Sequence, residues 1–127
     1  MIGWDQDELR RIGGATELRI APTAGGLGSR RAVPIWVVRV GDDLVVRSYR
    51  GGGGAWFRTA IRSGRASITA GGVQREVLLE PLPETARSAV DAAYRKKYGS
   101  GPYVDAMLAE AAVGTTVRLV PTQGAVG

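Results

Sequence analysis

The sequence predicts an α+β protein that is mainly β: a six-stranded antiparallel barrel, closed or half closed, with three or four peripheral helices. Six short runs of β-branched and apolar residues lie between turn-forming residues. Connections as short as Gly71-Gly72 favour hairpins between neighbouring runs. A length of 127 residues fits one domain. We therefore expect a single domain over residues 1–127, with frayed ends at 1–3 and 122–127.

The first part of the chain predicts one helix and three strands. Asp5 and Glu8 have the spacing of a capping box, which places a helix over residues 4–13. Trp4, just before the cap, is expected to pack against the rest of the protein. Residues 33–40 form a nearly continuous apolar run, so we expect a central strand that is covered on both faces. The expected strands are Thr16–Ala21, Val33–Val40 and Leu44–Tyr49, the last two joined by a turn at Gly41-Asp42-Asp43.

The last part of the chain predicts two helices among three further strands. The longest helical pattern covers residues 84–98, and its last turn carries Arg95-Lys96-Lys97, where positive charge favours the helix dipole. A second helix is expected over residues 102–114, with Tyr103 and Met107 four apart as a packing pair. The remaining expected strands are Arg65–Ala70, Val73–Glu80 and Thr115–Val120.

The composition excludes several kinds of chemistry. The chain has no cysteine and no histidine, which excludes disulfides, thiolate nucleophiles, zinc–sulfur sites and histidine bases. The sequence has no close acidic cluster, so we expect no metal. No apolar run approaches the roughly 20 residues that span a bilayer, and the first residues are acidic where a secretory leader would be apolar. We therefore expect a cytoplasmic protein without a membrane segment.

Basic and hydroxyl-bearing residues accompany the glycine-rich segments. The net charge is +5, with 17 Lys+Arg against 12 Asp+Glu, which favours an anionic partner. Ser29, Arg30 and Arg31 follow three glycines in one loop and can cradle a phosphate. Gly51–Gly54 lead into an expected helix over residues 55–63, whose N-terminus is a natural anion site. The alternatives are a flexible loop and an ordinary solvated surface.

Arg47 stands inside the third expected strand. A buried arginine requires a partner for its charge. One interpretation is an arginine at an edge or on the barrel exterior, paired with a carboxylate such as Glu76 or Asp43. The other interpretation places Arg47 among basic and hydroxyl groups that grip an anionic ligand.

Four blocks of the sequence resemble a family of small bacterial proteins classed as a domain of unknown function. The resemblance runs from about Trp4 to Pro121. Its most specific blocks are Ile35-Trp-Val-Val-Arg39 and Ala92-Ala-Tyr-Arg-Lys-Lys-Tyr-Gly99. The other two are the helix start Trp56-Phe57-Arg58 and the strand Thr115-Thr-Val-Arg-Leu-Val-Pro121.

More distantly, the chain resembles the split β-barrel flavoproteins, especially the deazaflavin-dependent nitroreductases and quinone reductases, and the FMN-binding split barrels. The matching positions are Gly28–Arg31 with Pro34, the loop 48–54, and the helix start 56–59. Phe57 and Thr59 depart from the tyrosine and asparagine that are usual there. The resemblance implies a split barrel that binds FMN or a deazaflavin through Arg30, Arg31, Pro34, Trp36, Arg47, Ser48, Trp56, Arg58 and Thr59.

These observations lead to three hypotheses about function. The first is an oxidoreductase-like protein that binds a flavin or deazaflavin, with hydride transfer carried out by the cofactor. The second is a cofactor-free pocket protein: a small-ligand binder, or an isomerase or cyclase that uses Arg47, Tyr49 and Asp43. The third is a basic nucleic-acid or protein interaction module, which the scattered arginines disfavour. We expect a small anionic or phosphate-bearing ligand, and a homodimer because split barrels commonly pair.

Overall fold

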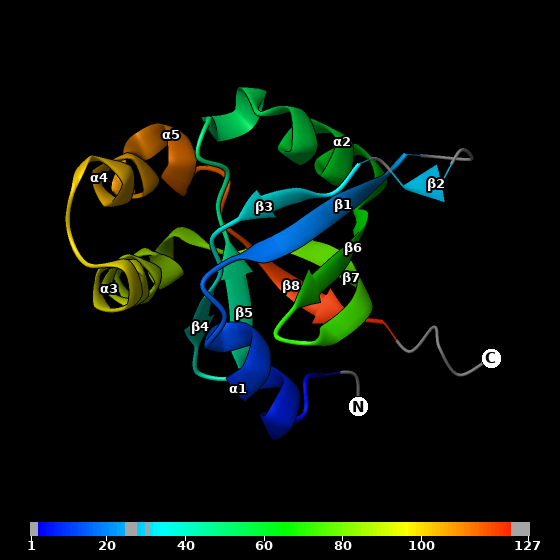
Figure 1. The fold of residues 1–127 in the computed structure, drawn as a ribbon. Helices are drawn as coiled ribbons and strands as arrows, with labels where there is room; N and C mark the ends of the chain where they lie inside the picture. Colours follow the sequence, from blue (N-terminus) through cyan, green and yellow to red (C-terminus); the bar gives the residue numbers. More distant parts are fainter. Residues whose placement is uncertain (1–2, 25–27, 30, 123–127) are drawn as a thin grey trace.

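The computed structural model describes residues 3–24, 28–29 and 31–122. One antiparallel sheet curls into a half-barrel, with α1 and α2 at opposite ends and α3, α4 and α5 together on one side (Figure 1). The strands are β1 (Leu18–Ala24), β2 (Gly28–Ser29), β3 (Val33–Ile35), β4 (Val38–Val40), β5 (Asp43–Val46), β6 (Arg65–Ala70), β7 (Val73–Pro81) and β8 (Val117–Pro121). The helices are α1 (Gln6–Gly13), α2 (Ala55–Ser63), α3 (Arg87–Tyr98), α4 (Pro102–Leu108) and α5 (Glu110–Val113), with short 3₁₀ turns η1 (Gly51–Gly53) and η2 (Glu84–Ala86).

The strand order confirms the expected mainly β, antiparallel class. The order is β2-β1-β6-β7-β8-β5-β4, and β3 pairs with β1 from outside this path. The β6–β7 hairpin turns at Gly71-Gly72, where φ values of 55° and 83° suit glycine. The described part of the chain has eight strands rather than the six expected. One addition is the two-residue β2, and the other comes from a break within residues 33–40.

The apolar run 33–40 does not form the single central strand expected from the sequence. It forms β3, which pairs with β1, and β4, which pairs with β5. Because β1 and β5 lie toward opposite ends of the strand order, this segment crosses the opening of the half-barrel. Trp36 and Val37 lie at the break. An apolar run alone does not distinguish one long strand from two short strands with different neighbours.

The C-terminal end of α3 supplies hydrogen bonds at this break. The Val37 N–H donates to the Tyr98 hydroxyl at 3.3 Å, and Lys97 Nζ donates to the Val37 carbonyl at 2.6 Å. The Tyr98 hydroxyl donates in turn to the Thr16 carbonyl at 2.6 Å. These bonds take the place of a strand ladder and hold the crossing segment against the residues that precede β1.

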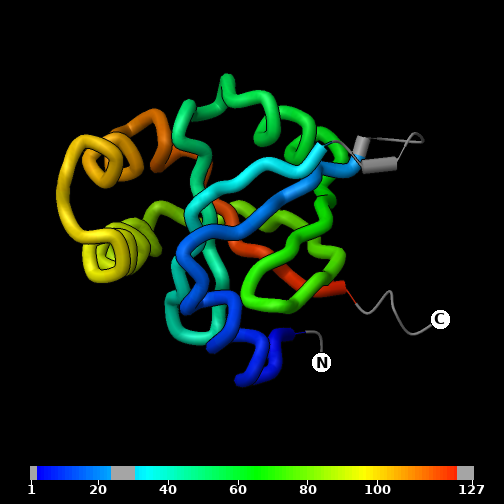
Figure 2. The backbone as a smooth tube through the Cα atoms, viewed as in Figure 1, coloured from blue at the N-terminus to red at the C-terminus, as the bar shows by residue number. Residues whose placement is uncertain are grey.

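The predicted helices form, with one additional break. α1 begins at the expected capping box, where the Asp5 carboxylate accepts from the Glu8 N–H at 2.8 Å. Trp4 packs against the core and donates from Nε1 to the Leu119 carbonyl at 2.8 Å. The N-terminal segment that contains α1 lies at one end of the half-barrel, beside the turn between β4 and β5 (Figure 2). The helix expected over residues 102–114 divides into α4 and α5, because Ala109 has the extended backbone φ −74°, ψ 156°.

The core has two parts, which lie on the two sides of β5. Leu44 and Val46 face the barrel interior, where α1 and α2 add their apolar sides. Val45 faces the other way, into a second cluster that includes Tyr94 and Met107 under α3 and α4. Leu44, Val45 and Val46 of β5 are therefore buried on both faces of the strand, whereas the sequence predicted such coverage for residues 33–40. In the described ranges, no helix has both the length and the apolar content to cross a membrane.

Candidate functional site

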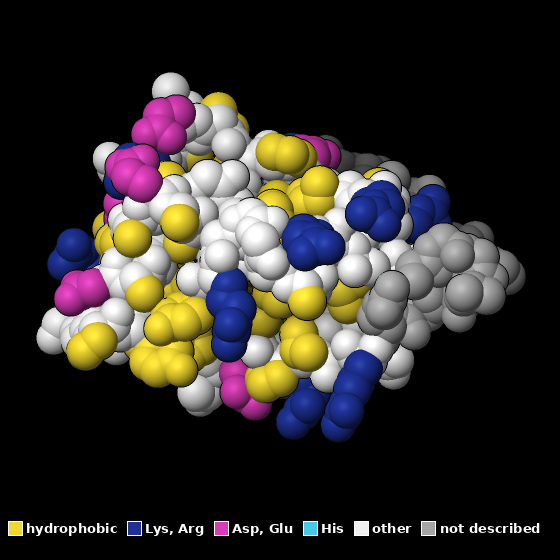
Figure 3. All heavy atoms as spheres, turned by 90° about the horizontal axis from the view of Figure 1, so that it is seen from above, with side chains coloured by type: hydrophobic (Ala, Val, Ile, Leu, Met, Phe, Trp, Pro, Cys, Tyr) yellow, Lys and Arg dark blue, Asp and Glu magenta, His cyan; other side chains and the backbone are white. Residues whose placement is uncertain are grey.

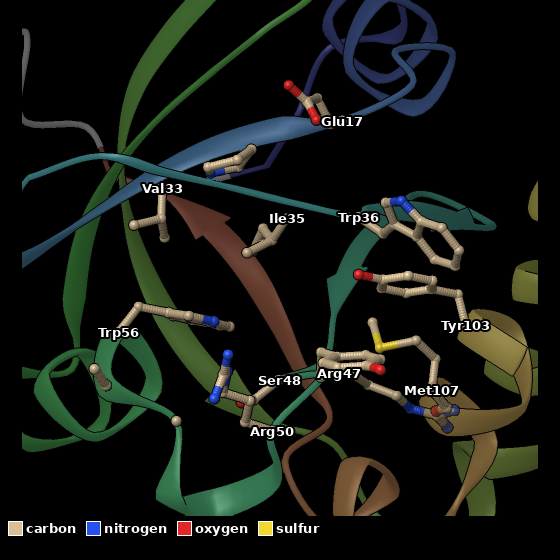
Figure 4. A pocket seen from close by; sticks show the side chains of 14 residues that line it. Glu17, Val33, Ile35, Trp36, Arg47, Ser48, Arg50, Trp56, Tyr103 and Met107 are labelled. Atoms are coloured by element: carbon tan, nitrogen blue, oxygen red, sulfur yellow. The ribbon is translucent and has the colours of Figure 1, made fainter.

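A pocket of about 360 Å³ lies where the half-barrel is open. Four parts of the chain meet there: β3 with the crossing segment, the loop after β5, the start of α2, and α4 (Figure 4). One wall is formed by Val33, Pro34 and Ile35 of β3. Glu17, just before β1, adds an exposed carboxylate at the rim.

A second wall of the pocket is aromatic. Trp36 stacks face to face on Tyr98, with 3.9 Å between ring centroids and 3° between the ring planes. Tyr103 of α4 lies 5.9 Å from Trp36 and 4.9 Å from Tyr49, and its hydroxyl points into the pocket in Figure 4. Met107, one turn along α4, completes this wall. The wall offers flat, polarizable surfaces to a planar ligand.

The floor of the pocket is the loop from Ser48 to Gly54. Ser48 is buried: its N–H donates to Thr115 Oγ1 at 2.8 Å, and its hydroxyl donates to the Gly51 carbonyl at 2.7 Å. A Cβ at Gly54 would lie 2.6 Å from Ser48 Oγ, which is too close for any other residue without rearrangement. The loop is therefore folded tightly on itself, and the close approach of Ser48 requires a glycine at position 54.

The end of the floor is favourable for negative charge. Gly54 is the N-cap of α2 and supplies no side-chain cap, so the N–H groups of the first turn have no partner within the helix. Gly54, Ala55 and Trp56 all line the pocket, which brings this helix end to the ligand space. Arg50 lines the same side as Trp56 in Figure 4. A helix N-terminus beside an arginine attracts an anionic or hydrogen-bond-accepting group.

Arg47 is fully buried behind the pocket, and the expected pairing with Glu76 or Asp43 is wrong. Its Nη1 donates to the Asp91 carboxylate at 2.7 Å and to the Met107 carbonyl at 2.9 Å. Its Nε donates to Thr116 Oγ1 at 2.8 Å, and the buried Nη2 has no hydrogen-bond partner among the residues that the structure describes.

The carboxylates first expected to pair with Arg47 have other partners. Glu76 bonds to the Ser67 hydroxyl, and Asp43 pairs with Arg118. The pairing with Asp91 joins residues 44 apart in sequence, and only the packing of α3 on β5 creates it.

A smaller pocket of about 190 Å³ lies on the other side of Trp56. It shares Val33, Ala55 and Trp56 with the larger pocket and is otherwise lined by Pro22, Arg31 and Thr59. Trp56 therefore lines two adjoining spaces, the larger with Arg47 and Arg50 and the smaller with Arg31.

The residues predicted for cofactor binding divide among these places. The larger pocket is lined by Pro34, Trp36, Arg47, Ser48 and Trp56, and the smaller by Arg31, Trp56 and Thr59. Arg58 is exposed on α2 and lines neither. Arg30 lies outside the described residues. Seen from above in Figure 3, the basic side chains are spread over this face, with apolar side chains between them.

Several residues that line the larger pocket were not predicted from the sequence. Tyr103 and Met107 belong to a helical packing pattern, and the spacing does not show that this face of α4 reaches the opening. Arg50 directly precedes the glycine run. This neighbourhood is the signal in the sequence that could have placed Arg50 at the pocket. Among the described residues, no group of three acidic, histidine or cysteine side chains is arranged to hold a metal ion.

The half-barrel fold is that of the split β-barrel proteins, and the comparison with solved structures supports this class. A structure described as an F420 reductase superposes with a TM-score of 0.62 at 9% identity, covering 94% of this chain and 96% of the other. A FAD-binding protein from Mesorhizobium loti gives a TM-score of 0.53 at 17% identity, covering 94% of this chain and 91% of the other. The FAD and heme binding protein from Mycobacterium smegmatis gives 0.50 at 17% identity, covering 91% and 65%. At these identities the likeness shows the fold alone.

The sequence identifies the family directly. Residues 8–119 match the family described as "Uncharacterized protein conserved in bacteria (DUF2255)", and the chain belongs to this family. The match covers nearly the whole structure from α1 to β8 and confirms the resemblance to a small bacterial family. A comparison with curated proteins finds no match.

Proposed function

We propose that this chain binds a flavin or deazaflavin in the larger pocket and acts as a reductase of the split β-barrel type. The observation that carries the proposal is the pairing, in one pocket, of an aromatic wall with a helix N-terminus beside Arg50. A planar ring system could stack on the aromatic wall, and its anionic or carbonyl-bearing edge could face the helix N-terminus and Arg50. The neighbours described as F420 reductase and FAD-binding protein support the same class of ligand.

The residues present fit such a group in size and in chemistry. A volume of about 360 Å³ falls within the range of roughly 300–1,000 Å³ that is typical of small-molecule sites. Trp36 and Trp56 offer flat surfaces on opposite sides of the space in Figure 4. The tight Ser48–Gly54 floor brings Gly54 and the first residues of α2 to the lining of the pocket.

Each part of the chain has a separate role in this proposal. The aromatic wall with Trp36 would pack against the ring and exclude water. Arg50 and the first-turn N–H groups of α2 would bind the polar edge of the ring or a phosphate. Arg31 and Thr59, in the adjoining pocket, would hold an anionic side arm that passes Trp56. A flavin or deazaflavin bound here would supply the hydride transfer, and the protein would supply position and surroundings.

The test is a titration of the purified protein with FMN and, separately, with a deazaflavin, followed by fluorescence. We expect micromolar binding of at least one. Arg50→Ala is expected to raise Kd about tenfold, the loss of one charge-assisted hydrogen bond. Arg62→Ala is the matched control, because Arg62 is exposed in the last turn of α2, away from both pockets, and its loss should leave Kd unchanged.

Two results would contradict the proposal: no binding of either compound, or binding that Arg50→Ala and Arg62→Ala weaken equally. The homodimer expected from the resemblance stays a prediction, and light scattering of the same preparation measures it.

The second candidate is a cofactor-free small-ligand binder or an isomerase or cyclase. One observation favours it: the charge of Arg47 is already paired with the Asp91 carboxylate, so this buried arginine adds little net positive charge for a phosphate. An apolar ligand would then be held by the aromatic wall alone. Binding of uncharged aromatic compounds without any binding of FMN or deazaflavin would favour this candidate over the first.

A further inference from the structure

The charges of this chain are segregated along the sequence. Residues 18–75 contain ten arginines and only two acidic residues, Asp42 and Asp43, which gives this stretch a net charge of +8. The whole chain carries +5, so the remaining residues together are net acidic. Because the stretch includes α2 and the strands β1 to β6, the fold determines where on the surface its positive charge appears.

At the α1 end of the half-barrel, arginines of this stretch are paired with carboxylates. Arg75 pairs with Glu8 of α1 at 2.5 Å. Arg39 lies 3.6 Å from Asp42 in the turn between β4 and β5, and Asp43 follows at the start of β5. Both aspartates of the stretch therefore lie near α1, at the end of the half-barrel opposite α2 (Figure 1).

The α2 end has the opposite character. The exposed side chains of α2 are those of Ala55, Arg58, Ile61 and Arg62, and Arg65 is exposed directly after the helix. α2 contains no acidic residue. Within the part of the chain that the structure describes, none of these three arginines forms an ion pair. The exposed face of α2 therefore carries positive charge without a counter-charge.

The carboxylates on the adjacent part of the sheet have partners of their own. β7 pairs with β6, and Glu76 and Glu80 of β7 are exposed. Glu76 is bonded to the Ser67 hydroxyl. Glu80 accepts a hydrogen bond from Arg118 at 2.7 Å. Figure 3 looks onto the α2 end and shows basic side chains with apolar side chains between them.

We propose that the α2 surface, formed by Arg58, Ile61, Arg62 and Arg65, docks on the anionic face of a phospholipid membrane. The three guanidinium groups bind lipid phosphates, and the Ile61 side chain enters the headgroup region. The contact is peripheral. It does not depend on the ligand of the pockets, because none of these four residues lines either pocket.

Two features favour a lipid surface over a nucleic acid. Proteins that bind single strands use exposed aromatic side chains on which bases stack, but Trp56 and Phe57 of α2 pack against the core. The large side chain exposed among the arginines is Ile61, at 43%. An aliphatic side chain beside cations is typical of interfacial membrane contacts, where burial of the apolar group adds to the attraction between charges.

Docking through α2 also places the pockets close to the lipid. Ala55 and Trp56, in the first turn of α2, line both pockets. Arg62 is seven residues after Ala55, which is roughly 10 Å along a helix. A membrane bound at the α2 surface therefore lies within about two helical turns of the ligand space.

The experiment is co-sedimentation of the full chain with vesicles of phosphatidylglycerol and phosphatidylcholine in equal parts, and with vesicles of phosphatidylcholine alone. We expect binding to the anionic vesicles only, and weaker binding at high salt. Arg58→Glu with Arg62→Glu should lower the partition coefficient at least about 25-fold, since each arginine contributes about fivefold. Arg95→Glu with Lys96→Glu is the matched control: it changes the net charge equally, in the exposed last turn of α3, and should retain the binding.

Two milder variants separate charge from apolar contact. Arg58→Gln with Arg62→Gln, which keeps long polar side chains, should also weaken the binding, whereas Ile61→Ser should weaken it severalfold without changing its salt dependence. Thermal unfolding checks that each variant is folded. FMN titration of the same variants should give the wild-type result, so failure of flavin binding and failure of membrane docking are observed separately.

Four results would overturn the inference. They are no binding to anionic vesicles, equal loss in the α2 and α3 double variants, unchanged binding of Ile61→Ser, and tighter α2-dependent binding to a single-stranded oligonucleotide than to the vesicles. The last result would assign the α2 surface to a nucleic acid instead.

Discussion

The Arg47 guanidinium and the Asp91 carboxylate form an ion pair of 2.7 Å that joins the residue after β5 to the middle of α3. Arg47 is fully buried, and Asp91 is 24% exposed. Arg87 extends the pair, at 3.7 Å from Asp91 and 2.9 Å from Glu110. The same Arg47 guanidinium holds the Met107 carbonyl of α4. Since the pocket floor begins at the next residue, this network sets the distance between the floor and the aromatic wall.

We expect Asp91→Ala to destabilise the protein by about 2–3 kcal/mol, because it leaves a buried guanidinium without its counter-charge. This expected loss lies at the low end of the range for buried ion pairs, since Asp91 retains some contact with water. Urea unfolding followed by circular dichroism measures the change. Asp105→Ala, at an exposed position of α4, is the control and should shift the urea midpoint little.

The double variant Arg47→Met with Asp91→Leu tests whether the unpaired buried charge causes the loss of stability in Asp91→Ala. Removing both charges also removes the desolvation cost, so the double variant should be more stable than Asp91→Ala alone. A double variant as unstable as the single one would mean that packing, rather than the unpaired charge, determines the loss.

Gly54→Ala is expected to cost about 1–2 kcal/mol and to weaken ligand binding, because the new Cβ lies 2.6 Å from Ser48 Oγ and displaces its bond to the Gly51 carbonyl. Gly53→Ala is the matched control, with no atom within 4 Å of its Cβ and an ordinary φ. Thermal unfolding of both variants measures the difference. In a Ser48→Ala background, the cost of Gly54→Ala should shrink; an unchanged cost would exclude the clash as its cause.

Lys97 makes stability depend on pH in a defined direction. Burial holds the pKa of Lys97 at about 8 in the folded protein, below its value of about 10.4 in an unfolded chain. Between these values the unfolded chain binds more protons, so the free energy of unfolding should rise as the pH increases from 8 toward 10. Below pH 8 the amine is charged in both the folded and the unfolded chain, so the full desolvation penalty for burying that charge remains. Burial raises the pKa of Tyr98 to about 12, and this opposes the trend only above pH 10.

The measurement is urea unfolding at pH 7, 8 and 9.5. The increase in the free energy of unfolding with pH should be smaller in Lys97→Met than in the wild type, whereas Lys96→Met should retain the wild-type increase. A rise that is equal in wild type and Lys97→Met would contradict the assignment.

The fold was largely predictable because local patterns and the final contacts agree in most elements. The capping box at Asp5 and Glu8, the hairpin at Gly71-Gly72 and the strand 65–70 depend on neighbouring residues, and all three form as expected. The prediction failed at residues 33–40, where a long apolar run is shared between two partners at opposite ends of the sheet. Nothing within the run indicates where the partner changes.

The candidate site was predictable only in part. Pro34, Trp36, Ser48 and Trp56 belong to segments whose glycines or strand residues stand out in the sequence, and they line the larger pocket. Tyr103 and Met107 were missed because a helical packing pattern is the same for a face that reaches a core and for one that reaches an opening.

The sequence by itself determined the mainly β antiparallel class, the helix starts, and the absence of cysteine and histidine chemistry, because these depend on residue type and local spacing. The tertiary structure decided that residues 33–40 cross the opening and that Arg47 pairs with Asp91. It also decided that α4 supplies a pocket wall and that Lys97 is bound at the strand break. These contacts join residues far apart in the chain, so only the packing of α3 and α4 against the sheet creates them.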